Sequence, residues 1–113
     1  MFQALLRILP LMRPTLAAKL AGVNGFTGRG AIAYSAAKSG VKTLSVKLDG
    51  LAGRGAEILA DETHAVQIKI RNGHADETFV SKKGHRVPDL KEGDRIDVQQ
   101  NGDVILSGVL TRN

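Results

Sequence analysis

The C-terminal half of the chain shows a hydrophobic alternation of period two, and this pattern most limits the folds that the chain can adopt. Apolar and polar residues alternate through residues 66–71 and 95–99, and positions 104–110 are mostly apolar. Asn72-Gly73 follows the first run and Asn101-Gly102 lies between the other two. Asn-Gly between such runs is the strongest short signal for a β-hairpin. We therefore expect antiparallel β-structure in this half.

The last hairpin predicts a strand that is apolar on both faces. If Gln100 pairs with Asp103 across the turn, Val98 lies opposite Ile105 on one face, and Leu106 lies on the other. Both faces then need a cover. A small closed barrel or roll provides it, and so does a sheet with a helix packed against it.

The N-terminal segment, over positions 1–20, shows helical spacing instead. Its apolar residues recur at steps of three and four, which predicts an amphipathic helix. We expect Pro10 to kink this helix, Pro14 to begin its second part and Gly22 to end it. Packing on its own domain, docking in a partner's groove, lying on a membrane surface and acting as an organelle-targeting segment remain open for it. The apolar stripe consists of Phe2, Leu5, Leu9, Met12, Leu16 and Leu20.

These patterns together predict an α+β fold in two parts. Residues 1–57 are expected to form an N-terminal amphipathic helix and a basic, Gly-rich arm. Residues 58–113 are expected to form a C-terminal antiparallel small β-barrel or roll. Residues 31–48 fit either a helix or a pair of strands.

Basic residues dominate the N-terminal part of the chain. The formal net charge is +5, yet positions 1–48 hold seven Lys and Arg side chains and no acidic one. The remainder, with nine basic and eleven acidic residues, is slightly acidic. Such an asymmetry is typical of a basic arm that contacts nucleic acid or an acidic protein surface, although a solvated basic face would show the same count.

A segment around Tyr34 carries a resemblance to a known family. The run Ala33-Tyr34-Ser35-Ala36-Ala37-Lys38-Ser39-Gly40, with its flanks over residues 9–55, resembles the active-site region of short-chain dehydrogenases/reductases. The resemblance implies an oxidoreductase that uses NAD(P). In it Tyr34 would be the general acid, and Lys38 would lower the pKa of Tyr34 and hold the nicotinamide ribose.

Two parts of that family's machinery have no counterpart here. The position of the family's catalytic Ser falls at residues 20–23, which read Leu-Ala-Gly-Val. The stretch before Tyr34 is too short for the Gly-rich cofactor turn and its sheet. We therefore expect a protein without enzymatic activity and without a cofactor, with a dehydrogenase-like fragment as the alternative.

The C-terminal hairpin carries a second resemblance. Residues 90–110, with the entry Leu-Lys-Glu-Gly-Asp, are similar to barrel strands of bacteriophage tail-hub and head-to-tail connector proteins. This implies a structural subunit that oligomerises with itself and docks through its arm into a larger complex, such as a phage particle or a nucleoprotein. It would place the protein in the cytoplasm or the virion, and nucleic-acid binding is a further alternative.

Candidate contacts with a partner come from the basic residues, and no metal site is expected. His64, His74 and His85 lie ten and eleven residues apart, without the short spacing of metal ligands. No run approaches the roughly 18 uncharged apolar residues that a membrane span requires. The candidate partner-binding residues are Arg7, Arg13, Lys19, Arg29, Lys38, Lys42, Lys82, Lys83 and Arg86.

Overall fold

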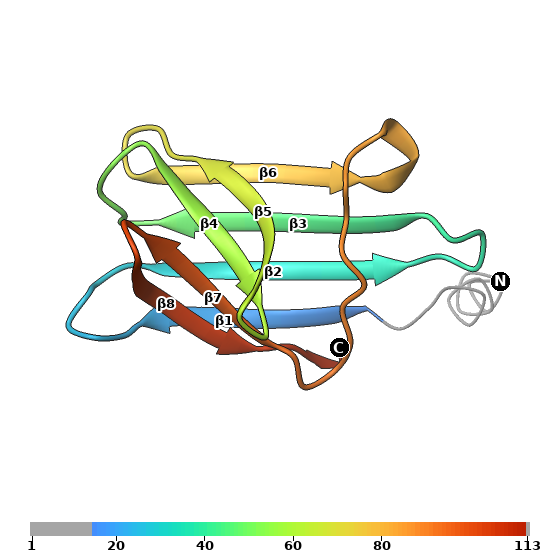
Figure 1. Cartoon of the computed structure of the whole chain (residues 1–113), viewed down its shortest axis with the longest axis horizontal. Helices are drawn as coiled ribbons and strands as arrows, with labels where there is room; N and C mark the ends of the chain where they lie inside the picture. The colour runs from blue at the N-terminus through green and yellow to red at the C-terminus, as the bar shows by residue number, and fades with distance from the viewer. Residues whose placement is uncertain (1–14, 113) are drawn as a thin grey trace, which may run out of the picture.

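The computed structural model describes residues 15–112, which form a single antiparallel β-sheet rolled into a nearly closed barrel (Figure 1). The strands are β1 (Leu16–Gly22), β2 (Arg29–Ala36), β3 (Lys42–Asp49), β4 (Gly55–Ala60), β5 (Thr63–Lys69), β6 (His74–Val80), β7 (Arg95–Gln100), β8 (Asp103–Val109) and β9 (Thr111–Arg112). The strand order is β5-β4-β7-β8-β1-β2-β3-β6, and β9 pairs with β1. A single 3-10 turn, η2 (Ser81–Lys83), follows β6 within the described part of the chain.

The sheet folds over itself into two layers. Strands β1, β2, β3 and β6 lie side by side in one layer, and β4, β5, β7 and β8 cross in front of it (Figure 1). Strands β5 and β6 are the two edges of the sheet. A short turn joins them and they then diverge, so the barrel stays open along the seam between these two strands (Figure 1).

Alternating side chains fill the interior between the layers. In β3, Leu44, Val46 and Leu48 point inward and are at most 1% exposed, whereas Lys47 between them is exposed. Strands β1 and β2 show the same alternation, which is the one expected for a sheet with one buried face. The largest fully buried side chains are Ile32, Leu44, Leu48, Ile58, Ile96, Leu106, Leu110, Val46 and Val98.

Both predicted Asn-Gly turns are confirmed. The residues of each turn have positive φ, 51° and 84° at Asn101 and Gly102, as a tight hairpin turn requires. The predicted pairing of Gln100 with Asp103 is also confirmed, but the next one is wrong: Val98 pairs with Leu106, because a β-bulge shifts the register between Val98 and Gln99.

That bulge explains why β8 is apolar at successive positions. Ile105 and Leu106 are 2% and 0% exposed, so both side chains enter the core from one strand. An extra residue in one strand of a pair breaks the strict alternation of faces. Ile105 and Leu106 are therefore both buried in the same core, and no further element has to pack on the outer face of β8 to bury them.

The predicted α+β class is wrong, because the described residues contain no α-helix. Leu16 and Leu20 of the expected helical stripe belong to β1, whose buried positions are Leu16, Ala18 and Leu20. These residues fit period two as well as the helical spacing, and pairing of β1 with β2, β8 and β9 selects the strand. The part of the expected helix over residues 1–14 lies outside the described residues.

The N-terminal part of the described chain belongs to the same sheet as the C-terminal part. Residues 31–48, for which a helix and a pair of strands remained open, form the β2–β3 hairpin. The expected boundary between residues 57 and 58 falls inside β4, which pairs with β5 and β7. One core therefore contains side chains from both sides of that boundary.

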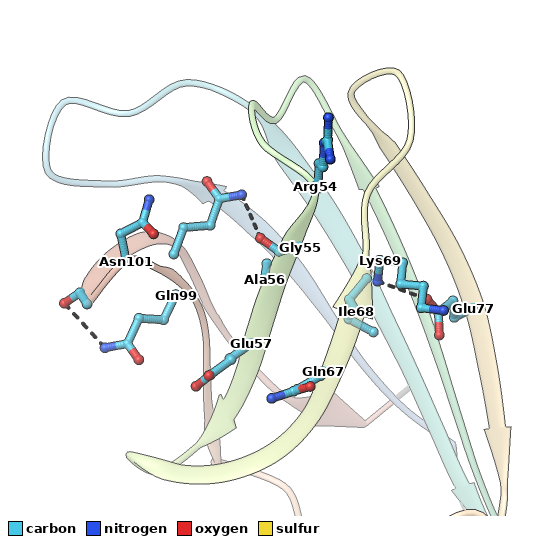
Figure 2. A pocket seen from close by; sticks show the side chains of 12 residues that line it. Arg54, Gly55, Ala56, Glu57, Gln67, Ile68, Lys69, Glu77, Gln99 and Asn101 are labelled. Atoms are coloured by element: carbon cyan, nitrogen blue, oxygen red, sulfur yellow. Dashed lines mark hydrogen bonds between the residues drawn. The ribbon is translucent and has the colours of Figure 1, made fainter.

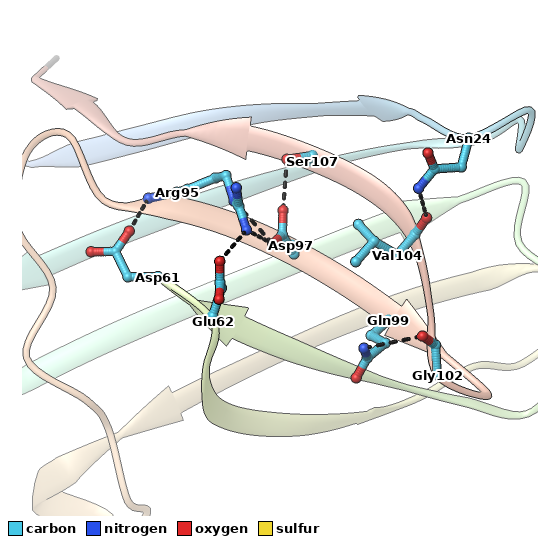
Figure 3. Close-up of polar contacts among 9 residues, drawn as sticks. All are labelled: Asn24, Asp61, Glu62, Arg95, Asp97, Gln99, Gly102, Val104 and Ser107. Carbon is cyan, nitrogen blue, oxygen red and sulfur yellow. Dashed lines mark hydrogen bonds and ion pairs between the residues drawn. The ribbon is translucent and has the colours of Figure 1, made fainter.

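A group of polar contacts around a buried carboxylate connects the turn between β4 and β5 with strands β7 and β8 (Figure 3). Asp97 in β7 is 3% exposed and accepts hydrogen bonds from Ser107 Oγ at 2.7 Å and from Arg95 Nε at 3.1 Å. The backbone N–H of Arg95 donates to Asp61 Oδ1 at 2.8 Å, and its guanidinium lies 3.4 Å from Glu62 Oε2. Both oxygens of the buried Asp97 carboxylate thus accept a hydrogen bond, which compensates for the burial of its charge.

Candidate partner-binding site

Five of the predicted basic residues lie on two loops at one end of the barrel, which we call the basic end: Lys38, Lys42, Lys82, Lys83 and Arg86. Lys38 lies in the turn between β2 and β3, and Lys42 begins β3. The other three lie in η2 and just after it, beyond the end of β6. Because β3 pairs with β6, with Thr43 opposite Val80, the two loops meet at the same end of the sheet (Figure 1).

Backbone hydrogen bonds hold each loop in shape. In the first loop Ala37 N–H donates to Val41 O at 2.8 Å and Gly40 N–H donates to Ala37 O at 2.9 Å. In the second loop Gly84 adopts φ of 86° and its N–H donates to Ser81 O at 3.1 Å, which closes η2. The lysines therefore project from ordered turns.

Two side chains that the sequence did not single out for partner binding help to hold these loops in place. Ser81 Oγ accepts the backbone N–H of Lys42 at 2.8 Å, and this bond joins the two loops directly. His85 Nδ1 accepts the N–H of Val80 at 2.9 Å, while its ring meets Phe79 edge-on at 5.8 Å. The only sequence signal for these roles is their place beside the basic run, since a contact between distant parts of the chain has no local pattern.

Only Lys42 among the basic-end residues has an acidic partner within the described chain. Its Nζ lies 2.9 Å from Asp89 Oδ1, and this hydrogen bond raises the pKa of Lys42. The side chains of Lys38, Lys82, Lys83 and Arg86 are exposed. The basic end therefore presents positive charge to solvent, with one ion pair at its margin.

The remaining candidates lie elsewhere. Lys19 projects from the outer face of β1, and Arg29 begins β2, opposite Asp49 at the other end of the sheet. Neither belongs to the basic end. Arg7 and Arg13 lie outside the described residues.

The two residues of the dehydrogenase resemblance lie in different settings. Tyr34 belongs to β2, is 5% exposed and packs in the hydrophobic core. Lys38 is exposed in the turn that follows β2. The contact one helical turn apart that the resemblance implies needs a helix, and this segment is a strand followed by a turn.

Residues 15–112 hold no group of three or more His, Asp or Glu side chains arranged to bind a metal ion. His74 Nδ1 instead contacts Asp49 Oδ1, across the β3–β6 pair. Within the same residues, no helix has the length and apolar character needed to cross a membrane.

The basic end thus offers a set of cations held on ordered turns. Its side chains can bind anions through charge and hydrogen bonds, as Lys and Arg do on phosphate and carboxylate surfaces. No protein-family model matches this chain, and no curated protein matches it.

Proposed function

We propose that this protein is a non-enzymatic assembly module that docks through its basic end onto an acidic surface of a larger complex, of the phage-particle or nucleoprotein type. The observation that carries the proposal is the meeting of two loops, distant from each other in sequence, that bring five basic side chains to one end. Four of the five have no acidic partner within residues 15–112. Positive charge held on ordered turns favours an anionic partner.

The path of the chain also supports this end as the docking surface. Leu16, at the start of β1, pairs with Tyr34, close to the turn that carries Lys38. Arg7 and Arg13 precede this point in a segment without acidic residues. The described part of the chain therefore begins at the basic end, directly after the segment that carries these two arginines.

The test measures binding to two anionic probes, a 20-base-pair DNA duplex and poly-glutamate, at several salt concentrations. The variant replaces Lys82, Lys83 and Arg86 with Gln. If each of these residues contacts one phosphate, the slope of log K against log salt for DNA falls by about 2.7, at about 0.9 for each contact. Arg7→Gln with Arg13→Gln tests the arm in the same assay.

The matched control removes three basic residues from the opposite part of the barrel: Arg54, Lys69 and Arg71, each replaced by Gln. This variant has the same net charge as the first and keeps the basic end. We expect its affinity and salt slope to stay close to those of the unmodified protein. Equal losses in both variants, or none in the first, would refute docking through the basic end.

Self-association is the second part of the proposal. A structural subunit of this kind is expected to form a closed homo-oligomer. Multi-angle light scattering at increasing protein concentration should then give a multiple of the 12.0 kDa chain mass. A mass of one chain at every concentration contradicts homo-oligomerisation and leaves the docking test unaffected.

A further inference from the structure

A groove crosses the outer face of β4, β5 and β7 (Figure 2). The β7–β8 turn that borders it lies at the end of the barrel opposite the basic end (Figure 1). Its volume is about 660 Å³. The glycines Gly55 and Gly102 line it and, having no side chains, leave the space between the longer side chains open.

Planar polar side chains form a row across the groove. Glu57 of β4 pairs with Gln67 of β5 on one side and with Gln99 of β7 on the other. Figure 2 shows these three side chains on the same face of the sheet. Neighbouring strands lie about 4.8 Å apart, so the three side chains follow one another at about that interval. The supporting backbone is a β-ladder, which fixes their spacing.

A second amide fixes one wall of the groove. Gln100 Nε2 donates to Ala52 O at 2.7 Å and to Gly55 O at 3.0 Å, so this side chain joins the end of β7 to the start of β4. Gln99 is held less tightly, because its Nε2 lies 3.4 Å from Gly102 O. Gln67 is exposed, and its amide points into the groove (Figure 2).

The charges that line the groove balance. Arg54 and Lys69 supply two positive groups, and Glu57 and Glu77 supply two negative groups. A polyanion gains little from such a surface, in contrast to the basic end. Amide side chains both donate and accept hydrogen bonds, which suits a neutral ligand rich in hydroxyl groups.

We propose that this groove binds a neutral oligosaccharide. The hydroxyl groups of a sugar need donors and acceptors side by side, and the amides of Gln67 and Gln99 supply both on a rigid sheet face. No aromatic residue lines the groove, so no ring can stack on a sugar face. The affinity is therefore weak, on the order of 1 mM for a short oligosaccharide.

A peptide added as a strand along β5 is the main competing occupant. The groove reaches the free edge of β5, where backbone groups could pair with an incoming strand. At this edge, however, Lys69 N–H already donates to Glu77 Oε1 at 3.0 Å. The side chain of Glu77 thus blocks part of the edge, and the amide row favours a sugar.

The test is an NMR titration of the full chain, labelled with nitrogen-15, with maltohexaose and cellohexaose as probes. We expect saturable shifts of the backbone and side-chain amides of Gln67 and Gln99 with at least one probe. Gln67→Leu and Gln99→Leu keep the side-chain volume and remove the hydrogen bonds, and each should weaken binding by about tenfold. Thr27→Val, on the exposed loop between β1 and β2, is the matched control and should bind as the unmodified protein does.

Three results would overturn the proposal. The first is an absence of saturable shifts with both sugars at tens of times the expected dissociation constant. The second is unchanged binding in both Leu variants. The third is that an unrelated extended hexapeptide, and not the sugars, shifts Gln67 and its β5 neighbours.

Discussion

Replacing Asp97 with Asn tests how much the buried polar contact of β7 contributes to stability. The carboxylate is 3% exposed and accepts hydrogen bonds from Ser107 Oγ at 2.7 Å and Arg95 Nε at 3.1 Å, and its Oδ2 forms an ion pair with Arg95 Nη2 at 3.0 Å. An Asn side chain has nearly the same shape and keeps one acceptor oxygen for Ser107. Its NH2 group, however, then faces the N–H groups of Arg95, and two donors in contact cannot form a hydrogen bond.

The structure sets the size of the effect. A hydrogen bond to a charged group contributes about 1.5–3 kcal/mol to stability. The Arg95 side chain is half exposed, so solvent weakens its ion pair with Asp97 and lowers the contribution of that pair to stability. We expect Asp97→Asn to lower the free energy of unfolding by about 2 kcal/mol. For a domain of this size that corresponds to a Tm lower by roughly 10 °C. Ser107→Ala should cost about 1 kcal/mol and Glu62→Gln, at the exposed 3.4 Å contact, under about 0.5 kcal/mol.

Urea unfolding followed by circular dichroism at pH 7 measures all three variants. The reasoning requires the order Asp97→Asn, then Ser107→Ala, then Glu62→Gln, with unchanged m-values. A change of less than about 0.5 kcal/mol in Asp97→Asn would be no larger than that of an ordinary surface substitution and would contradict this reasoning. A loss of stability in Glu62→Gln equal to that in Asp97→Asn would also show that the buried carboxylate is not the centre of the network.

Three further predictions concern stability. The backbone N–H of Arg95 lowers the pKa of Asp61, so the stability that the Asp61 carboxylate contributes is present above about pH 4 and is lost as the pH falls through the lower folded pKa. In urea unfolding, Asp61→Asn should therefore flatten the dependence of stability on pH below about pH 4. A Cβ on Gly108 would collide with the carbonyl oxygen of Lys19, so Gly108→Ala should lower Tm. Gly55→Ala is the control, because a Cβ has room there, and it should leave Tm unchanged. Equal Tm values for the two variants would contradict the close approach of β8 to β1. Leu106→Ala, at 0% exposure, should cost about 2–5 kcal/mol by calorimetry, and a loss under about 1 kcal/mol would place Leu106 outside the core.

Local patterns in the sequence predicted both Asn-Gly turns and the β7–β8 hairpin, but not the N-terminal strands. The strands that flank Asn72-Gly73 do not pair with each other, because β6 pairs with β3 instead. Asn101-Gly102 specifies its turn because both residues adopt positive φ readily. Leu16 and Leu20 satisfy period two and a helical step of four equally well, so their spacing could not select a strand. The bulge beside Val98 was also missed, since its extra residue is visible only once β7 and β8 are paired.

The candidate sites divide in the same way. The sequence supplied Lys38, Lys42, Lys82, Lys83 and Arg86 as candidates, because charge is a property of each residue alone. It did not show that they share one end and that Lys19 and Arg29 do not, because this depends on the pairing of β3 with β6.

By itself, the sequence determined the two Asn-Gly turns, the alternating strands beside them and the excess of positive charge. Each of these depends on the conformational preference or charge of residues close together in the chain. Tertiary structure alone decided that residues 16–22 form a strand, that the sheet rolls until β5 and β6 nearly meet, and that Gln67, Glu57 and Gln99 form a row. These features come from pairing between distant strands, whose free energy is gained only when the whole barrel buries its shared core.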